Sequence, residues 1–160
     1  MEKKIKILHT CELPLERREV GEDYAFDRAD IVRADGSSRC GVRIYSIPPG
    51  KANYPYHWHE THEEVFYVIS GRGVVLTPEG ESSLASGDAL VCPPCAEGAH
   101  KITNTGVEPL VYLEFDTVSF PEVAHYPQSD GIGVLFANRQ KNHFFIGGES
   151  VSYEELSERG

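Results

Sequence analysis

The chain has 160 residues and a formal net charge of −10, with 40% hydrophobic and 25% charged residues. This length suffices for one domain with its own apolar core, and the composition is that of a globular protein. The acidic charge argues against a nucleic-acid partner, which would need a basic face. The chain has neither an apolar run of roughly 18 residues nor a signal-peptide core, so we expect a cytoplasmic protein without a membrane partner.

Residues 1–39 are mixed and charged, with no clear helical or strand period. We interpret them as an N-terminal arm that holds one or two short strands and packs on a partner subunit. A turn is expected at Gly36, where glycine is followed by two serines.

From Cys40 the chain changes to short β-branched and aromatic runs separated by turns rich in Gly and Pro. Strands at such regular spacing are typical of an all-β sandwich or barrel, and the lack of helix-period segments between them argues against a parallel βαβ sheet. The predicted strands are 40–47, 63–70, 73–77, 88–92, 100–104, 110–117 and 133–137.

The C-terminal part is less regular. Residues 143–149 fit either a last strand or a loop, and 150–160 predict a short helix capped by Ser150 or Ser152. We therefore expect one domain over residues 1–160, with its barrel core at about 40–118 and a C-terminal extension at 119–160.

A run of three histidines and three glutamates, HWHETHEE, begins at His57. If residues 55–59 are extended, His57 and His59 share one face, because successive side chains of a strand alternate. Glu64 lies in the next predicted strand, and His100 begins another from which a third imidazole could reach the same point. Imidazole and carboxylate ligands together suit Zn, Fe, Mn, Ni or Cu. By the same alternation, Glu63 should point away from Glu64.

These residues resemble the two sequence motifs of the cupin superfamily, and the resemblance covers about residues 40–118. The first motif is matched by Gly50, His57, His59, Glu64 and Gly71, with six residues after the first glycine where five is usual. The second is matched by Gly87, Pro93, Gly98, His100 and Asn104. Here the segment between proline and glycine is longer than usual, and the gap before the histidine is one residue short.

The resemblance implies an all-β double-stranded β-helix, the cupin jelly-roll barrel. It implies one divalent transition-metal ion (Mn, Fe, Zn or Ni) held by His57, His59, Glu64 and His100. It also implies a small-molecule ligand or substrate and a homodimer. The alternative is a polar core without metal, which is less favoured because buried imidazoles and a carboxylate would then need many partners to offset desolvation.

Two classes of function stay open. One is a small metalloenzyme of isomerase, decarboxylase or dioxygenase type that acts on a sugar derivative or a small oxygen-rich acid. The other is a non-enzymatic sensor or small-ligand-binding protein. Small single-domain cupins are often labelled as sugar-phosphate isomerases or oxalate-decarboxylase-like proteins, but these labels rest on fold analogy, which does not fix a reaction.

Residues around the metal are expected from strand parity and from their neighbours in the sequence. The pocket candidates are Arg43, Tyr45, Tyr56, Phe66, Val68 and Asn104. For Arg43 and Tyr45, surface and core positions are equally open, because parity alone does not identify the inner face. His62 is the candidate general acid or base, although a solvated loop position is favoured for it. A phosphate group would need a basic residue at the mouth, and the candidates are Arg43, Lys51, Arg72 and Lys101.

The chain has four cysteines, and Cys92 and Cys95 form a CPPC sequence. A reducing cytosol would keep them as thiols. A redox pair normally begins a helix, where the dipole lowers the thiol pKa, and a zinc site would need two more close ligands. We therefore favour plain thiols over either role.

Overall fold

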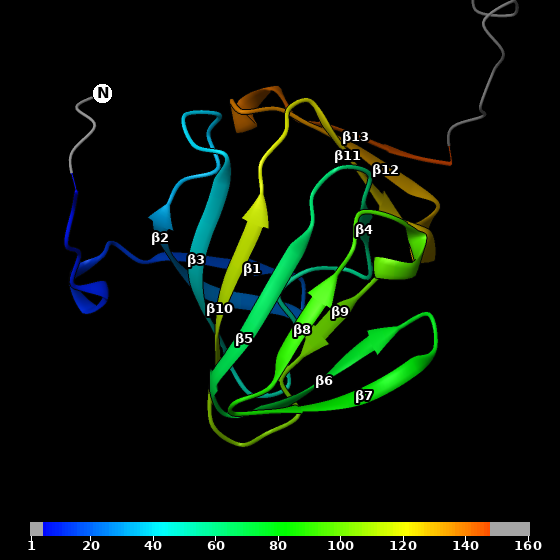
Figure 1. Cartoon of the computed structure of the whole chain (residues 1–160). Helices are drawn as coiled ribbons and strands as arrows, with labels where there is room; N and C mark the ends of the chain where they lie inside the picture. Colours follow the sequence, from blue (N-terminus) through cyan, green and yellow to red (C-terminus); the bar gives the residue numbers. More distant parts are fainter. Residues whose placement is uncertain (1–4, 148–160) are drawn as a thin grey trace, which may run out of the picture.

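The computed structural model describes residues 5–147, which form thirteen strands and four short 3₁₀ turns (Figure 1). The strands are β1 (Glu16–Val20), β2 (Tyr24–Val32), β3 (Cys40–Ile47), β4 (Trp58–His59), β5 (Glu64–Ser70), β6 (Arg72–Thr77), β7 (Gly80–Ala85), β8 (Ala89–Cys92), β9 (Lys101–Thr103), β10 (Leu110–Thr117), β11 (Glu122–Tyr126), β12 (Gly131–Leu135) and β13 (His143–Ile146). The 3₁₀ turns are η1 (Thr10–Glu12), η2 (Ala96–Gly98), η3 (Pro127–Ser129) and η4 (Arg139–Lys141). Over this range, no helix has the length and apolar character that a bilayer crossing requires.

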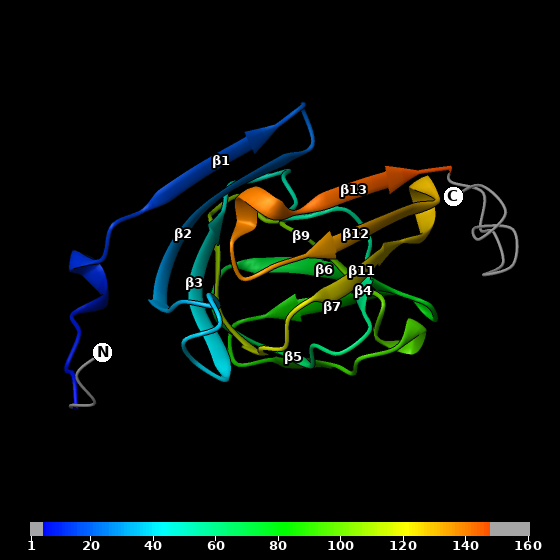
Figure 2. The same cartoon turned by 90° about the horizontal axis from the view of Figure 1, so that it is seen from above.

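The strands form three antiparallel sheets that enclose one interior (Figure 2). The largest has the order β1-β2-β3-β10-β5-β8, the second β13-β12-β11-β4 and the third β7-β6-β9. Several neighbours in a sheet are far apart in the sequence: β10 lies between β3 and β5 and pairs with both. The predicted all-β barrel is confirmed.

Most predicted strands agree with the observed ones. The predictions at 40–47 and 110–117 match β3 and β10 to the residue, and residues 143–146 adopt the strand alternative as β13. The sequence analysis missed β7, whose side chains are mostly polar, and β11. The predicted C-terminal helix lies outside the described residues.

The prediction of an arm over residues 1–39 is only partly right. The segment before β1 is exposed and stands clear of the sheets in both views (Figures 1 and 2). In contrast, β2 has nine residues, pairs with β3 and buries Phe26 and Arg28. It is therefore an integral strand of the largest sheet.

The inner face of the largest sheet changes along its strands from apolar, through aromatic, to charged. Tyr45 and Tyr112 stack in the aromatic layer with ring centroids 5.3 Å apart. In this direction the buried residues are Ile47, Tyr45 and Arg43 on β3, Leu110, Tyr112, Glu114 and Asp116 on β10, and Val68, Phe66 and Glu64 on β5. The apolar end closes the barrel, and the charged end faces the histidines.

Gly71 ends the tight connection between β5 and β6 and has a backbone φ of +88°. A Cβ atom there would lie 2.4 Å from the carbonyl oxygen of Pro109, which is a fixed backbone atom. Gly87 has a similar φ of +94°, but a Cβ atom there would have no heavy atom within 4 Å. A substitution at Gly87 therefore measures the energy of the left-handed backbone without any steric clash.

We expect Gly87→Ala to lower the free energy of unfolding by about 1 kcal/mol, from the left-handed backbone alone. Gly71→Ala should cost about 2 kcal/mol more, because the neighbouring strand must move. Urea unfolding of both variants measures the difference. Equal losses of unfolding free energy in the two variants would show that the backbone at the start of β10 moves to accept the methyl group without cost.

Candidate metal centre

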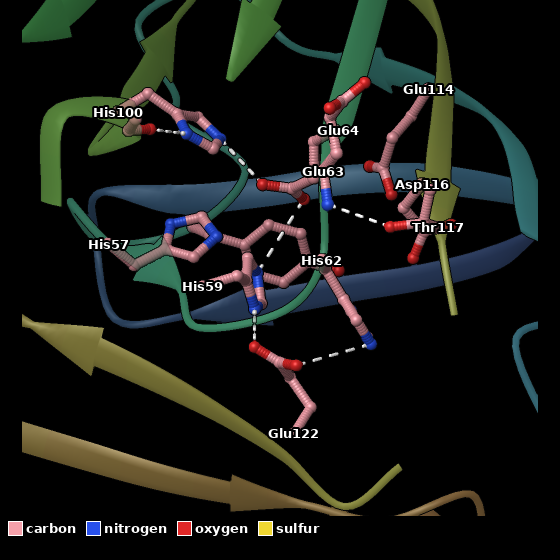
Figure 3. A network of polar contacts seen from close by, with 12 residues as sticks. His57, His59, His62, Glu63, Glu64, His100, Glu114, Asp116, Thr117 and Glu122 are labelled. Atoms are coloured by element: carbon pink, nitrogen blue, oxygen red, sulfur yellow. Dashed lines mark hydrogen bonds and ion pairs between the residues drawn. The ribbon is translucent and has the colours of Figure 1, made fainter. Parts of the chain in front are cut away.

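His57 and His100 are placed by a direct backbone bridge. The N–H of His57 donates to the carbonyl oxygen of His100 at 3.1 Å, and the N–H of His100 donates to that of His57 at 2.9 Å. The two imidazoles therefore leave the backbone side by side, with ring centroids 4.8 Å apart. Figure 3 shows both rings beside the Glu64 carboxylate.

His59 reaches the same point from β4, which pairs with β11. Trp58 points to the opposite side and stacks on His125 of β11, with ring centroids 3.9 Å apart and an interplanar angle of 5°. This contact holds β4 against β11. The predicted alternation of side chains around the His-Trp-His run thereby places His57 and His59 on the interior side.

Glu64 lies at the centre of the cluster. His59 Nε2 is 3.8 Å from its Oε1, and His100 Nε2 is 3.5 Å from its Oε2 (Figure 3). Ligand atoms of His57, His59 and Glu64 all lie within 4.8 Å of one another. Glu63 is exposed on the other face of β5, as its parity predicts. The structure thus brings the four predicted side chains together.

Two imidazoles are fixed through Nδ1. His57 Nδ1 lies 2.9 Å from the carbonyl oxygen of Pro55, and His100 Nδ1 lies 3.0 Å from that of Gly98. A carbonyl oxygen only accepts hydrogen bonds, so Nδ1 carries the proton in both rings and Nε2 keeps its lone pair. This tautomer is the one that a metal-binding imidazole needs when its other nitrogen is anchored to the protein.

The protonation states also suit a cation. Burial lowers the pKa of His57 well below its usual value and that of His100 to about 4, so both rings are neutral near pH 7. Burial raises the pKa of Glu64 to about 8. A carboxyl group held neutral by burial becomes a carboxylate when a positive charge is placed beside it.

A metal ion fits this donor set. His100 Nε2 is buried and has no hydrogen-bond partner among the described residues. Such a group costs free energy unless something occupies its lone pair. Three imidazoles and one carboxylate are ligands that Zn, Fe, Mn and Ni all accept.

Glu122, which the sequence analysis missed, supports His59 from behind. It is fully buried, and its carboxylate accepts hydrogen bonds from the backbone N–H and the hydroxyl group of Thr61. Its Oε1 lies 3.4 Å from His59 Nδ1, although without hydrogen-bond geometry. Burial opposes ionisation of Glu122, but His59 and Thr61 outweigh it and lower its pKa to about 2. Burial opposes protonation of His59, but the carboxylates of Glu122 and Glu64 outweigh it and raise the pKa of His59 above its usual value.

His62 is buried, so the favoured expectation of a solvated loop residue is wrong. Its Nε2 lies between the backbone nitrogen and oxygen of Ser119, at 3.1 and 2.8 Å, and 3.7 Å from Glu122. Its ring packs on His59 with centroids 5.3 Å apart. These contacts hold the segment before β11 in place, so they give His62 a positioning role and leave no free Nε2 for proton transfer.

A cavity of about 530 Å³ opens beside the histidines. Of the predicted pocket residues, Arg43 and Tyr45 line it, whereas Tyr56 does not, and its place is taken by Tyr54. The chain is irregular before β4, so strand parity does not carry over from Tyr56 to the wall.

The other three pocket candidates lie elsewhere. Phe66 and Val68 are buried in the apolar core, where Phe66 packs on the ring of His100 at 5.2 Å. Asn104 is fully buried and holds two loops together, since its amide donates to the carbonyl oxygens of Ile47 and Glu108. All three support the site from below and do not line the cavity.

Arg43 is neutralised by acidic side chains. It donates to Glu114, and its Nη1 lies 3.1 Å from Asp116 Oδ1 and its Nε 3.7 Å from Asp30 Oδ1. Glu114 and Asp116 were not predicted to point inward, yet both line the cavity. The wall beside Glu64 is therefore rich in hydrogen-bond acceptors (Figure 3).

Cys92 and Cys95 are free thiols. Cys92 is buried on β8 opposite Glu64, and burial raises the pKa of its thiol. Cys95 precedes only the three-residue turn η2 and no α-helix. The pair therefore lacks the environment that activates a redox cysteine.

Comparison with known proteins supports this interpretation of the fold. Residues 43–116 match the sequence model of a family described as "Cupin domain". An uncharacterized protein of Methanocaldococcus jannaschii is 35% identical over 80 residues, which cover 50% of this chain and 60% of that protein. A glucose-6-phosphate isomerase of Thermococcus gammatolerans is 38% identical over 63 residues, which cover 36% of this chain and 32% of the isomerase. The chain thus spans less than two thirds of the length of these relatives.

A solved structure matches nearly the whole chain. It is a sugar phosphate isomerase of the cupin superfamily from Silicibacter pomeroyi, with a TM-score of 0.78 at 20% identity over 93% of this chain and 98% of that one. A sequence identity of 20% supports a shared fold only. The expected double-stranded β-helix is confirmed.

We expect Glu122→Gln to lower the affinity for Zn²⁺ by roughly 10- to 100-fold, because the charge that orients His59 is lost. The measurement is a competition titration with a chromogenic chelator, with circular dichroism to confirm the fold. Glu60→Gln is the matched control, since Glu60 directly follows His59 in the sequence but its carboxylate pairs with His125 at 2.9 Å. Equal Zn²⁺ affinities for the two variants would show that Glu122 does not support metal binding.

Proposed function

We propose that this chain, whose residues 43–116 match the cupin-domain family, binds one divalent transition-metal ion through His57, His59, Glu64 and His100 in order to act on a small oxygen-rich molecule. The observation that carries the proposal is the convergence of His57, His59 and Glu64, with ligand atoms within 4.8 Å of one another. They converge at a cavity large enough for a small organic molecule.

The bound ion would supply a Lewis acid that polarises a ligand oxygen and a template that orients it. The chain's own residues do the rest. His57 and His100 present fixed lone pairs, and Glu122 sets the ring of His59. Glu114 and Asp116 offer acceptors to a ligand hydroxyl group, and the aromatic walls exclude water, which strengthens each electrostatic contact inside.

Because several relatives and similar structures are named isomerases, we favour an isomerase over a decarboxylase or a dioxygenase as the reaction type. The alternative is a non-enzymatic protein that senses or stores a small metal-chelating ligand. The open cavity supports both over a purely structural metal site, because a structural ion would be sealed by side chains. The cytoplasmic location stays a prediction.

Purified protein should contain about one transition-metal ion per chain by elemental analysis, since the four side chains form one site. Replacing His57 and His59 together by Ala should abolish the bound metal, because two of the anchored ligands are lost. His143→Ala is the matched control, since His143 lies exposed on β13 outside the cluster. Unchanged metal content in the double variant would refute the site.

We also propose that the chain is a homodimer joined through the outer face of the largest sheet. This outer face consists of the outward side chains of β3, β10, β5 and β8, none of which is charged. Tyr67, Val91 and Phe115 on it are 50%, 61% and 40% exposed. In a chain of net charge −10, an uncharged face is where a second copy can pack without like-charge repulsion.

The segment before β1 supports a second copy as the occupant. Ile5, Ile7 and Leu15 are 98%, 87% and 70% exposed, so these apolar side chains have no cover within the described part of the chain. The first ten residues also hold three lysines and one glutamate, which makes them basic against an acidic body. We propose that this segment crosses to the partner.

Sedimentation velocity should show a dimer for the unaltered chain. Tyr67→Lys should shift the protein to monomer, because the substitution buries a charge in the interface. Val107→Lys is the control, since Val107 is 89% exposed in the turn before β10, away from the outer face. A monomer for the unaltered chain, or a dimer unaffected by Tyr67→Lys, would rule out this interface.

A further inference from the structure

The walls of the cavity are mainly aromatic. Of the chain's eight tyrosines and seven phenylalanines, nine line this one cavity. Several contact the histidine cluster directly. Tyr126 stacks on His57 with ring centroids 5.9 Å apart and an angle of 20°, Tyr54 meets the same ring edge-on at 6.1 Å, and Phe120 meets His62 at 5.8 Å. A molecule that reaches the metal ligands must therefore lie between aromatic rings.

The deep end offers no free cation for a phosphate group among the described residues. Among the basic residues considered from the sequence, only Arg43 lines the cavity, and it is held by Glu114, Asp116 and Asp30. Arg28, the other buried arginine, pairs with Glu16 and Asp30. Both buried arginines are thus paired with carboxylates, and these carboxylates would repel a phosphate dianion.

The other three basic candidates lie outside the cavity. Lys51 Nζ donates to the carbonyl oxygen of Glu22, Lys101 lies over the ring of Tyr24, and Arg72 is exposed at the start of β6. The arginines that do reach the cavity mouth, Arg18 and Arg139, are exposed to water. Solvent screens charges at such positions, so they add little affinity for a phosphate.

Exposed apolar side chains also line the mouth of the cavity. Phe144, Ile146 and Val20 line it and are 62%, 78% and 51% exposed. They lie on β13 and β1, each of which is the edge strand of its sheet. A ligand whose flat body extends from the histidines to the mouth would cover them, whereas a hydrated sugar would leave them wet.

Building on the proposed function, we propose that the cavity takes a planar aromatic molecule with two adjacent oxygen atoms at one end, in preference to a sugar phosphate. The two oxygens lie at the histidines and Glu64, where Glu114 and Asp116 can accept their protons in hydrogen bonds. The ring lies between Tyr54 and Tyr126, and the rest of the molecule runs out along Phe144.

The test uses 4-nitrocatechol as the probe and the full chain loaded with Zn²⁺, which does not oxidise catechols. Equilibrium dialysis gives the bound probe by its absorbance, and elemental analysis of the same sample gives the bound zinc. We expect saturable binding of one probe per chain with zinc retained. Millimolar glucose 6-phosphate should not displace the probe. 4-Nitrophenol, which lacks the second oxygen, should bind at least about tenfold more weakly, because it cannot chelate.

Substitutions in the walls separate recognition of the ring from metal binding. Tyr126→Ala and Phe144→Ala should each weaken probe binding by roughly three- to tenfold with zinc content unchanged, since each removes one aromatic contact. Val107→Ala, which truncates an exposed apolar side chain far from the cavity, should leave binding unchanged.

The outcomes distinguish this proposal from the one on which it rests. A chain that takes up no zinc would refute the metal centre itself. If the chain binds zinc, three results would refute the aromatic ligand and leave the metal centre intact. These are displacement of the probe by glucose 6-phosphate, removal of the zinc by the probe, and equal probe binding by the two wall variants and the unaltered chain.

Discussion

The buried carboxylate of Glu64 is the constraint on which the arrangement of the site depends. A carboxyl group removed from water must be neutral or must lie beside positive charge. Around it the protein places three imidazoles, two of which are held neutral with fixed lone pairs. Glu114 and Asp116 add further acidic groups on the neighbouring strand. The site as a whole therefore favours a cation, and the backbone anchors of His57 and His100 would fix the position of the proposed ion.

Much of this could be predicted from the sequence because it depends on local alternation. The strands 40–47 and 110–117 and the inward position of Glu64 follow from a period of two, and the His-Trp-His run needs only one short extended segment. The site residues that the sequence analysis missed take their positions from long-range contacts. Glu122 is 63 positions from His59 in the sequence and becomes its neighbour only when β11 pairs with β4. No pattern within either segment reports that pairing.

The inner face of β10 was unpredictable for a different reason. Hydropathy alone would turn Val111, Leu113 and Phe115 toward the core and Glu114 toward water, yet the burial is the reverse. The inversion is tolerated because Arg43 lies opposite Glu114 in the register of β3 and β10. A strand that places its charges inside and its apolar side chains outside is typical of a barrel that uses both of its faces. The inner charges belong to the cavity, and the outer apolar surface belongs to whatever covers the sheet.

Trp58 gives the site a property that none of its polar residues has. It is the only tryptophan in the chain, it lies between His57 and His59, and its ring is stacked on His125. The chain therefore carries an intrinsic fluorophore directly beside His57 and His59, two of its proposed metal ligands. Its fluorescence emission can report a movement of β4 against β11, and it can be read without attaching a dye.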